Sequence, residues 1–286
     1  MGSPMDSQTL TQNIDDSIDA GLDWLNTNGG PAFGAVRAVL DHVYGAGAWV
    51  LAAPPYPVMA VAVGALGWAA VSVRFGIATC VGLLICAFMG LWPETMATLA
   101  LVVTATGLAL LFAIPVGILA GYNPRLDAAF QPVADFFQTL PPYIYLLPAI
   151  ALMGFGPATA LSATVIVAIP PALRLTSHGV STTPAHFLEL GQATGSSPLQ
   201  MFFKIRLPFA MPSIMAGVNQ CLMMAFGMVV IAGIVGSGGL GATIYDAVRT
   251  LDISKSIDAA LAIVILTIVL DRITEGAVGK RARKPK

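Results

Sequence analysis

The chain has 286 residues, of which 56% are hydrophobic and only 10% carry a charge. An ordinary soluble domain carries about a quarter charged residues, and one globular core could not bury this much apolar surface. The composition therefore excludes a soluble domain and predicts an all-α protein that crosses a membrane several times. The three cysteines lie in apolar stretches without metal-ligand spacing, so we expect neither a metal nor a redox site.

Residues 1–50 precede the first long apolar stretch and are predicted to be an external segment. Apolar residues there recur at helical spacing, while Arg37 and Asp41 lie off that stripe. This pattern predicts an amphipathic helix along the membrane interface. A tail that packs on the membrane bundle is the alternative. The stripe consists of Phe33, Val36, Val39, Leu40, Val43 and Tyr44, with a weaker one at Ile14, Ile18, Leu22 and Leu25.

Long stretches without Asp, Glu, Lys or Arg locate the transmembrane helices, since a bilayer core needs roughly 20 helical residues. The charge-free stretch 136–173 is too long for one helix, and Gly154 to Pro157 interrupts it. We therefore predict a transmembrane domain over 51–278 with about seven spans. They cover residues 54–73, 75–92, 95–121, 139–155, 157–177, 208–235 and 257–277.

The positive charges predict the orientation, because Lys and Arg are retained on the cytoplasmic side of short loops. With the N-terminus outside, eleven Lys and Arg residues face the cytoplasm and three, Arg37, Arg249 and Lys255, do not. The segment 179–208 and the basic tail 279–286 are then cytoplasmic. The predicted location is a cell membrane, with the N-terminus outside and the C-terminus in the cytoplasm.

The segment 179–208 is a polar interruption between apolar stretches. Thr182, Thr183 and Pro184 indicate an N-cap and first turn, and Gly195 ends the short helix that follows. A second short helix is expected over 199–206. Because both ends of this segment continue into transmembrane helices, a push on it must tilt them.

The spacing in this segment resembles the loop motif of ABC importer permeases, Glu-Ala-Ala, three residues, Gly, nine residues, Ile-x-Leu-Pro. Glu189, Gly195 and Ile205 followed by Leu207 and Pro208 keep that spacing, while Leu190 and Gly191 replace the two alanines. The resemblance extends over about 49–273, including the stretches 91–96, 138–141, 145–148, 169–171, 215–220, 236–241 and 270–273. The chain is similar to the glycine betaine, proline betaine and choline branch of these permeases.

This resemblance implies a MetI-like permease fold in a type I ABC importer of a bacterial inner membrane. It implies two permease copies forming a homodimer, two cytoplasmic ATPase subunits that bind ATP and Mg²⁺, and an external substrate-binding protein. The permease itself would bind no cofactor, contact membrane lipid and no nucleic acid, and not be an enzyme. The implied ATPase-coupling residues are Glu189, Leu190, Gly191, Ala193, Gly195, Ile205, Leu207 and Pro208.

The implied cargo is a small methylated amine such as glycine betaine, choline, proline betaine or trimethylamine N-oxide. Aromatic faces attract a methylated ammonium, and polar side chains in membrane helices tend to face a cavity. On these grounds the candidate pathway residues are Phe137, Tyr143, Tyr145, Asn219, Gln220, Met223 and Met224. The alternative role of the polar ones is hydrogen bonding between packed helices.

Other function classes fit the sequence less well. A secondary transporter would place an ionisable residue in the middle of a span, whereas Asp271, Arg272 and Glu275 cluster at the end of the last one. A GxGxxG match at 236–241 follows a membrane helix rather than a β-strand, so it does not indicate dinucleotide binding. A permease for another small solute, such as an amino acid, stays an alternative.

Overall fold

The computed structural model describes the backbone of residues 4–282 and the side chains of residues 12, 13 and 15–276. All regular structure in this part of the chain is helical, which confirms the all-α prediction. The expectations for Ile14 and for the basic tail 279–286 lie outside the described side chains.

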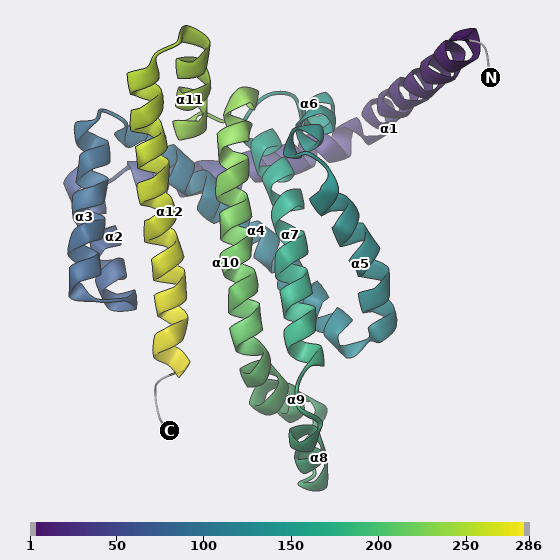
Figure 1. Ribbon diagram of the computed structural model, residues 1–286, viewed down its shortest axis with the longest axis vertical. Coiled ribbons are helices and arrows are strands. Elements are labelled where there is room, and N and C mark those ends of the chain that lie inside the picture. The colour runs from purple at the N-terminus through teal and green to yellow at the C-terminus, as the bar shows by residue number, and fades with distance from the viewer. Residues whose placement is uncertain (1–3, 283–286) are drawn as a thin grey trace.

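The helices follow one another with short connections (Figure 1). In chain order they are α1 (Pro4–Ala52), α2 (Tyr56–Ala70), α3 (Val73–Phe88), α4 (Trp92–Tyr122), α5 (Pro124–Thr139), η1 (Pro142–Tyr145), α6 (Leu146–Met153), α7 (Pro157–Ser181), α8 (Ala185–Ala193), α9 (Pro198–Met201), η2 (Phe202–Arg206), α10 (Leu207–Ala232), η3 (Gly233–Val235), α11 (Gly239–Thr250) and α12 (Ile253–Ala282).

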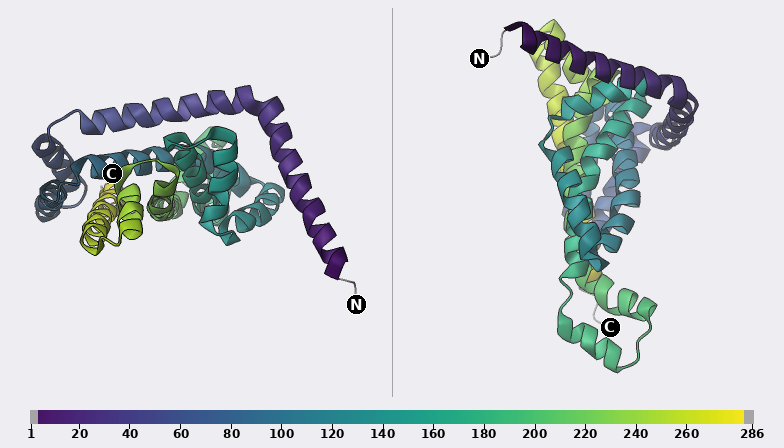
Figure 2. Two further views of the ribbon diagram at one scale, coloured as in Figure 1. Left: turned by 90° about the horizontal axis from the view of Figure 1, so that it is seen from above. Right: turned by 90° about the vertical axis from the view of Figure 1, so that its right-hand side faces the viewer.

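The centre of the molecule is α7, which packs most extensively against α10 and α4. The α2–α3 hairpin and α11 pack on α12, and α5 lies against α4 and α7. Helix α1 crosses one end of this bundle, and α8 with α9 projects from the opposite end (Figures 1 and 2). We call these the α1 end and the loop end.

Four continuous helices in the described chain are long and apolar enough to cross a membrane, and two bent pairs raise that number to at most six. The four are Trp92–Tyr122, Pro157–Ser181, Pro198–Val235 and Ile253–Gly276. Helices α2 and α3 fall on predicted spans but have only 15 and 16 residues. A multi-pass helical bundle is therefore confirmed, but α2 and α3 are shorter than the first two spans that the sequence predicted.

The predicted span over 139–155 is wrong as a single helix. The chain is extended at Leu140 and Pro141, with ψ angles of 138° and 135°, and α5 meets the η1–α6 segment at 103°. A residue that precedes proline is pushed out of the helical region by the proline ring, and each of these two residues precedes one. Only eight residues, Leu146–Met153, form α6.

The expected separate helix over 199–206 is also wrong, since one helix runs from Pro198 to Val235. Its turn over Phe202–Arg206 is a π-helix, in which the Leu207 N–H donates to the Phe202 carbonyl. Pro208 donates no N–H, and its ring would collide with the carbonyl four residues earlier. The wider π turn just before Pro208 lets the helix continue past it.

Glycines allow α4 to approach α7 closely. A Cβ atom on Gly117 would lie 2.7 Å from the Leu173 carbonyl, and one on Gly121 would lie 2.8 Å from the Ser177 carbonyl. In a membrane, association of helices depends on such close packing because lipid is as apolar as the side chains. Around this core, large apolar side chains of α2, α3 and α12 stay exposed, as a lipid-facing surface requires, among them Val61, Leu66, Ile77, Val264 and Ile268.

Helix α1 both packs on the bundle and extends beyond it. Leu40 and Tyr44, from the predicted apolar stripe, pack against the core, whereas Val36, Val39 and Val43 of the same stripe are exposed. The N-terminal part projects away from the bundle, and the helix bends along its length (Figure 2). Pro31 lies inside α1 and accounts for a bend, because proline removes a helical hydrogen bond.

Candidate functional site

The segment 179–208, named loop 179–208 below, projects from the loop end of the bundle (Figure 2). Pro184 is the N-cap of α8 and has no side chain that could accept a hydrogen bond. The predicted capping role of the two threonines is wrong, because their hydroxyls donate back into α7. Thr182 bonds to the His178 carbonyl at 2.7 Å and Thr183 to the Val180 carbonyl at 3.0 Å. These bonds stabilise the end of α7 rather than the start of α8.

The turn after α8 has the geometry of a Schellman motif, which ends a helix through a left-handed residue. Gly195 has a φ of 69°. The Ser196 N–H donates to the Gly191 carbonyl at 2.9 Å, and the Gly195 N–H donates to the Gln192 carbonyl at 3.0 Å. A left-handed residue costs little only when it is glycine, so Gly195 has the backbone that the resemblance to the permease motif required.

A capping box starts the returning helix. The Gln200 N–H donates to the Ser197 hydroxyl at 3.3 Å, and the Ser197 N–H donates to the Gln200 side chain at 3.0 Å. Together the two bonds satisfy two backbone groups that lack helical partners. Both sides of the turn are thus locally stabilised, which makes the tip of the loop a defined shape.

Gly191 is the point where the two halves of loop 179–208 touch. It is buried, and a Cβ atom there would lie 2.7 Å from both the Ile205 Cδ1 and the Met201 Cε atoms. A larger residue there would force the ends of the flexible Ile205 and Met201 side chains to move. The replacement of an alanine of the motif by Gly191 therefore permits an especially close contact with Ile205.

The outer surface of the loop exposes three large apolar side chains among polar ones. The exposed fractions are 60% for Leu190, 71% for Leu199 and 59% for Phe203, and Glu189 and Ala193 are exposed beside them. Large apolar side chains gathered on a projecting surface indicate a protein partner. Leu207 is partly buried at the base and Pro208 is exposed.

Two groups of pathway candidates lie on different elements. Phe137 and Tyr145 have ring centroids 6.0 Å apart, and the Tyr145 hydroxyl donates to the Phe137 carbonyl at 2.6 Å. Tyr145 is only 8% exposed, whereas Tyr143 is 56% exposed. On α10, Met223 is 52% exposed, while Asn219, Gln220 and Met224 are partly buried.

A polar seam between α5 and α7 was missed by the sequence reasoning. The Arg174 guanidinium on α7 pairs with the Asp135 carboxylate and donates to the Gln131 carbonyl at 3.0 Å and the Gln138 side chain at 3.2 Å. One turn further on, the Ser177 hydroxyl donates to Asp127 at 2.6 Å. The signal was present as helical spacing of Asp127, Gln131, Asp135 and Gln138, in a stretch interpreted only as a connection between spans.

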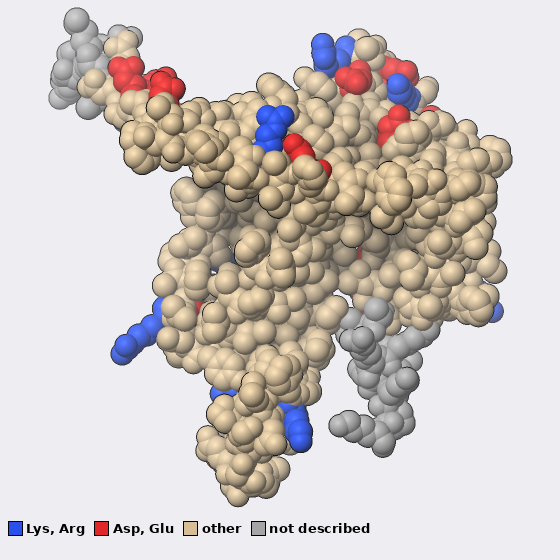
Figure 3. Space-filling view, turned by 180° about the vertical axis from the view of Figure 1, so that it is seen from behind, with Lys and Arg blue, Asp and Glu red and all other residues tan. Residues whose placement is uncertain are grey.

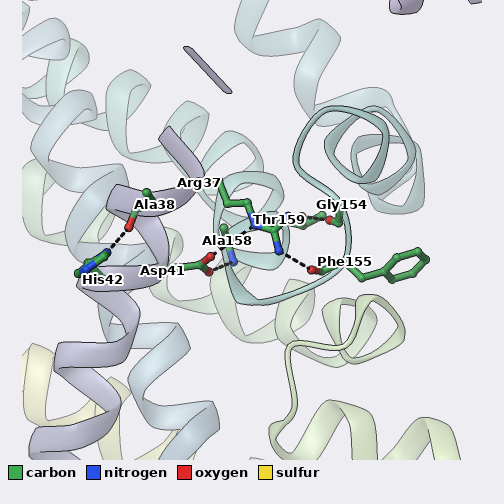
Figure 4. Close-up of polar contacts among 8 residues, drawn as sticks. All are labelled: Arg37, Ala38, Asp41, His42, Gly154, Phe155, Ala158 and Thr159. Carbon is green, nitrogen blue, oxygen red and sulfur yellow. Dashed lines mark hydrogen bonds and ion pairs between the residues drawn. The ribbon is translucent and has the colours of Figure 1, made fainter. Parts of the chain in front are cut away.

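A second set of missed contacts joins α1 to the turn before α7 (Figure 4). The Asp41 carboxylate accepts the Ala158 N–H at 3.1 Å and pairs with Arg37 at 3.5 Å. The Arg37 guanidinium also donates to the Phe155 carbonyl at 3.4 Å. The two charged residues predicted for the solvent face of an interfacial helix instead hold α1 on the bundle.

Comparisons with known proteins agree with this arrangement. Residues 113–283 match the family described as binding-protein-dependent transport system inner membrane component. The glycine betaine/proline betaine transport system permease protein ProW of Escherichia coli (strain K12) is 39% identical over 270 residues, which cover 94% of this chain and 76% of that protein. The glycine betaine transport system permease protein OpuAB of Bacillus subtilis (strain 168) is 36% identical over 269 residues, covering 94% and 95%.

Among solved structures, the inward-facing MetNI methionine ABC transporter superposes on the chain with a TM-score of 0.57 at 22% identity. The superposition covers 68% of this chain and 94% of that one. At this identity the likeness shows the fold, and it confirms the predicted MetI-like architecture. From the extent of the family match and of these identities, the chain belongs to the inner-membrane permease family of binding-protein-dependent ABC transport systems.

Proposed function

We propose that this chain is the permease subunit of an ATP-driven importer and forms the pathway for a small methylated amine. The relatives named above belong to glycine betaine and proline betaine transport systems. Glycine betaine, choline, proline betaine and trimethylamine N-oxide share a compact methylated nitrogen, and they define the proposed cargo class. As a permease of this family, the chain is a multi-pass inner-membrane transport subunit and not itself an enzyme.

The projecting loop 179–208 is the observation that carries this proposal. We propose that its exposed surface, with Glu189, Leu190 and Leu199, binds one of two cytoplasmic ATPase subunits that hold ATP and Mg²⁺. A second permease copy completes the pathway, and an external binding protein delivers the cargo. Nucleotide can drive transport only by favouring one conformation over another, and loop 179–208 is continuous with two membrane helices that such a change would tilt.

The charge distribution supports a cytoplasmic position for the loop end. Figure 3 shows acidic side chains mainly at the α1 end, while Lys and Arg dominate the loop end. Tyr122 at the end of α4 contacts Arg206, so Arg125, in the first turn of α5, also lies at the loop end. Because positive charge is retained in the cytoplasm, we propose that the N-terminus and α11 lie outside.

For the pathway, we propose that exposed aromatic and polarisable side chains give the cargo weak contacts. Tyr143 and Met223 keep open surfaces, and Asn219 has a buried side-chain oxygen without a hydrogen-bond partner among the described residues. Tyr145 supports the pathway wall through its bond to Phe137. Phe137, Gln220 and Met224 complete the proposed lining.

Reconstitution in liposomes tests the function. The permease, its ATPase and its binding protein are combined, and uptake of labelled glycine betaine, choline, proline betaine and trimethylamine N-oxide is compared with uptake of leucine. We expect uptake of at least one methylated amine that requires all three components and ATP. Glu189→Lys is expected to insert normally but to lose ATP-driven uptake. Flux through the permease alone, or preference for leucine, would contradict the proposal.

A further inference from the structure

The base of loop 179–208 contains one side chain that touches the ends of two membrane helices and stands at the start of a third. Arg206 is the last residue of the π turn that leads into α10. Its guanidinium carbon lies 4.4 Å from the centroid of the Tyr122 ring, at the end of α4. The same guanidinium donates to the Val180 carbonyl, near the end of α7, at 3.3 Å.

A second ring strengthens the contact with α4. Phe202 lies four residues before Arg206, so both side chains are on one face of the returning helix. The Phe202 and Tyr122 ring centroids are 6.4 Å apart. Tyr122 is therefore contacted by two successive turns of loop 179–208.

These contacts matter because α4 has no direct covalent connection with the loop. Loop 179–208 continues into α7 and α10, and a displacement of the loop acts on those two helices through the backbone. The end of α4 can follow the loop only through its packing on α7 and α10 and through direct side-chain contacts with the loop itself. Next to Tyr122, Gly121 lies so close to α7 that a Cβ atom would be 2.7 Å from the Val180 Cβ atom.

The chemistry of the Arg206 contact suits a joint between moving parts. A guanidinium is attracted to the face of an aromatic ring, and this attraction tolerates sliding better than a bidentate ion pair with its fixed fork geometry. The Arg206 Nε atom is buried and has no hydrogen-bond partner among the described residues. Among the same residues, no carboxylate forms an ion pair with Arg206 within 4.0 Å.

We infer that Arg206 and Tyr122 form the joint through which movement of loop 179–208 reaches α4. Arg206 is in this sense a positioning residue for transport, and Tyr122 is its partner. The inference rests on the proposed function, since it assumes that an ATPase moves the loop. Beyond the proposed function, the inference says that α4 moves with loop 179–208, although the two are far apart in the sequence.

The test uses the assembled transporter and measures solutes imported per ATP hydrolysed. Tyr122→Leu removes the ring, Tyr122→Phe keeps it, and Arg206→Met removes the charge. We expect the ratio to fall roughly tenfold in Tyr122→Leu and Arg206→Met, the size of one cation–ring contact in a partly dry site, and to stay within about twofold in Tyr122→Phe. The double variant Tyr122→Leu/Arg206→Met should be no worse than either single variant, since residues in contact are not additive.

Two controls separate this inference from the proposed function. ATP-dependent uptake by the unchanged transporter tests the function, and the amount of ATPase that copurifies with each variant tests assembly. An unchanged ratio in Tyr122→Leu, or losses that add up in the double variant, would overturn the joint. Failure of both Tyr122→Leu and Arg206→Met to assemble would overturn it as well, because the contact would then be structural only.

Discussion

The Asp41 carboxylate on α1 accepts the backbone N–H of Ala158 at 3.1 Å, across 117 positions of sequence. Ala158 is in the first turn of α7, whose own N-cap residue, Gly156, has no side chain. Asp41 therefore supplies from another helix the acceptor that a capping residue normally provides. It also places a negative charge at a helix N-terminus, where the helix dipole favours it.

Replacing Asp41 should destabilise the protein through this cap. The accompanying ion pair with Arg37 contributes little, because the two side chains are 46% and 39% exposed. Loss of a capping acceptor costs about 1 kcal/mol. We expect Asp41→Ala to lower the melting temperature in detergent by about 2–4 °C. The control is Asp23→Ala on the exposed part of α1, and an equal shift in both variants would contradict the capping role.

The stability of the protein should depend on the charge at position 135, which faces Arg174. Arg174 is 26% exposed and Asp135 63% exposed, so the partner loss in Asp135→Asn should cost about 1 kcal/mol after allowance for solvent. Asp135→Lys should cost more, because it faces Arg174 with a like charge. Thermal unfolding of these variants, in the Arg174 and the Arg174→Met backgrounds, provides the measurement. An equal cost of Asp135→Asn in both backgrounds would argue against a direct ion pair.

Gly121 and Gly107 form a matched pair on α4. A Cβ atom on Gly121 would lie 2.8 Å from the Ser177 carbonyl, whereas one on Gly107 would meet nothing within 4 Å. Overpacking of this kind costs typically about 1–3 kcal/mol. We expect Gly121→Ala to lower thermal stability and Gly107→Ala to leave it unchanged or raise it, since alanine favours the helix. Similar effects at the two positions would mean that α4 and α7 are not in close contact.

The backbone at Gly195 can be tested apart from its surroundings. Its φ is 69° and a Cβ atom there would meet nothing within 4 Å. Within this chain, the effect of a substitution must therefore come from the left-handed backbone, which costs ordinary residues about 1–2 kcal/mol but is tolerated by asparagine. We expect Gly195→Val to reduce ATP-driven uptake strongly and Gly195→Asn to retain most of it, at equal amounts in the membrane. Equal uptake by the two variants would disprove a role for the turn.

The proposed orientation can be read from cysteine labelling in vesicles. Native Cys86 and Cys221 are buried, so a Cys80→Ser background should react little with an impermeant maleimide. Leu190→Cys, at a 60% exposed position, should label only in inverted vesicles and should be protected by added ATPase. Val248→Cys on α11, at a 61% exposed position, should label only in right-side-out vesicles. The reverse pattern would invert the topology.

Much of the fold followed from local sequence features. Charge-free stretches located helices correctly because a membrane helix must satisfy its backbone groups within the segment itself. The same locality made the turn at Gly195 predictable from one residue. The prediction of spans failed at Leu140 and Pro141, where each residue precedes a proline and the helix ends. It also failed before Pro208, where a π turn joins two helices that were expected to be separate. The helix α5 was missed because its polar face was interpreted as a loop.

The sequence alone determined that this protein lies in a membrane, the approximate positions of its membrane helices and the residue spacing within loop 179–208. Only the tertiary structure decided that Asp41 caps α7, that Asp135 pairs with Arg174, and that Arg206 rests on Tyr122. The physical reason is the distance along the chain over which each interaction acts. Hydropathy, capping and turn preferences act over a few residues along the chain, whereas these contacts depend on how separate helices are rotated and set against each other.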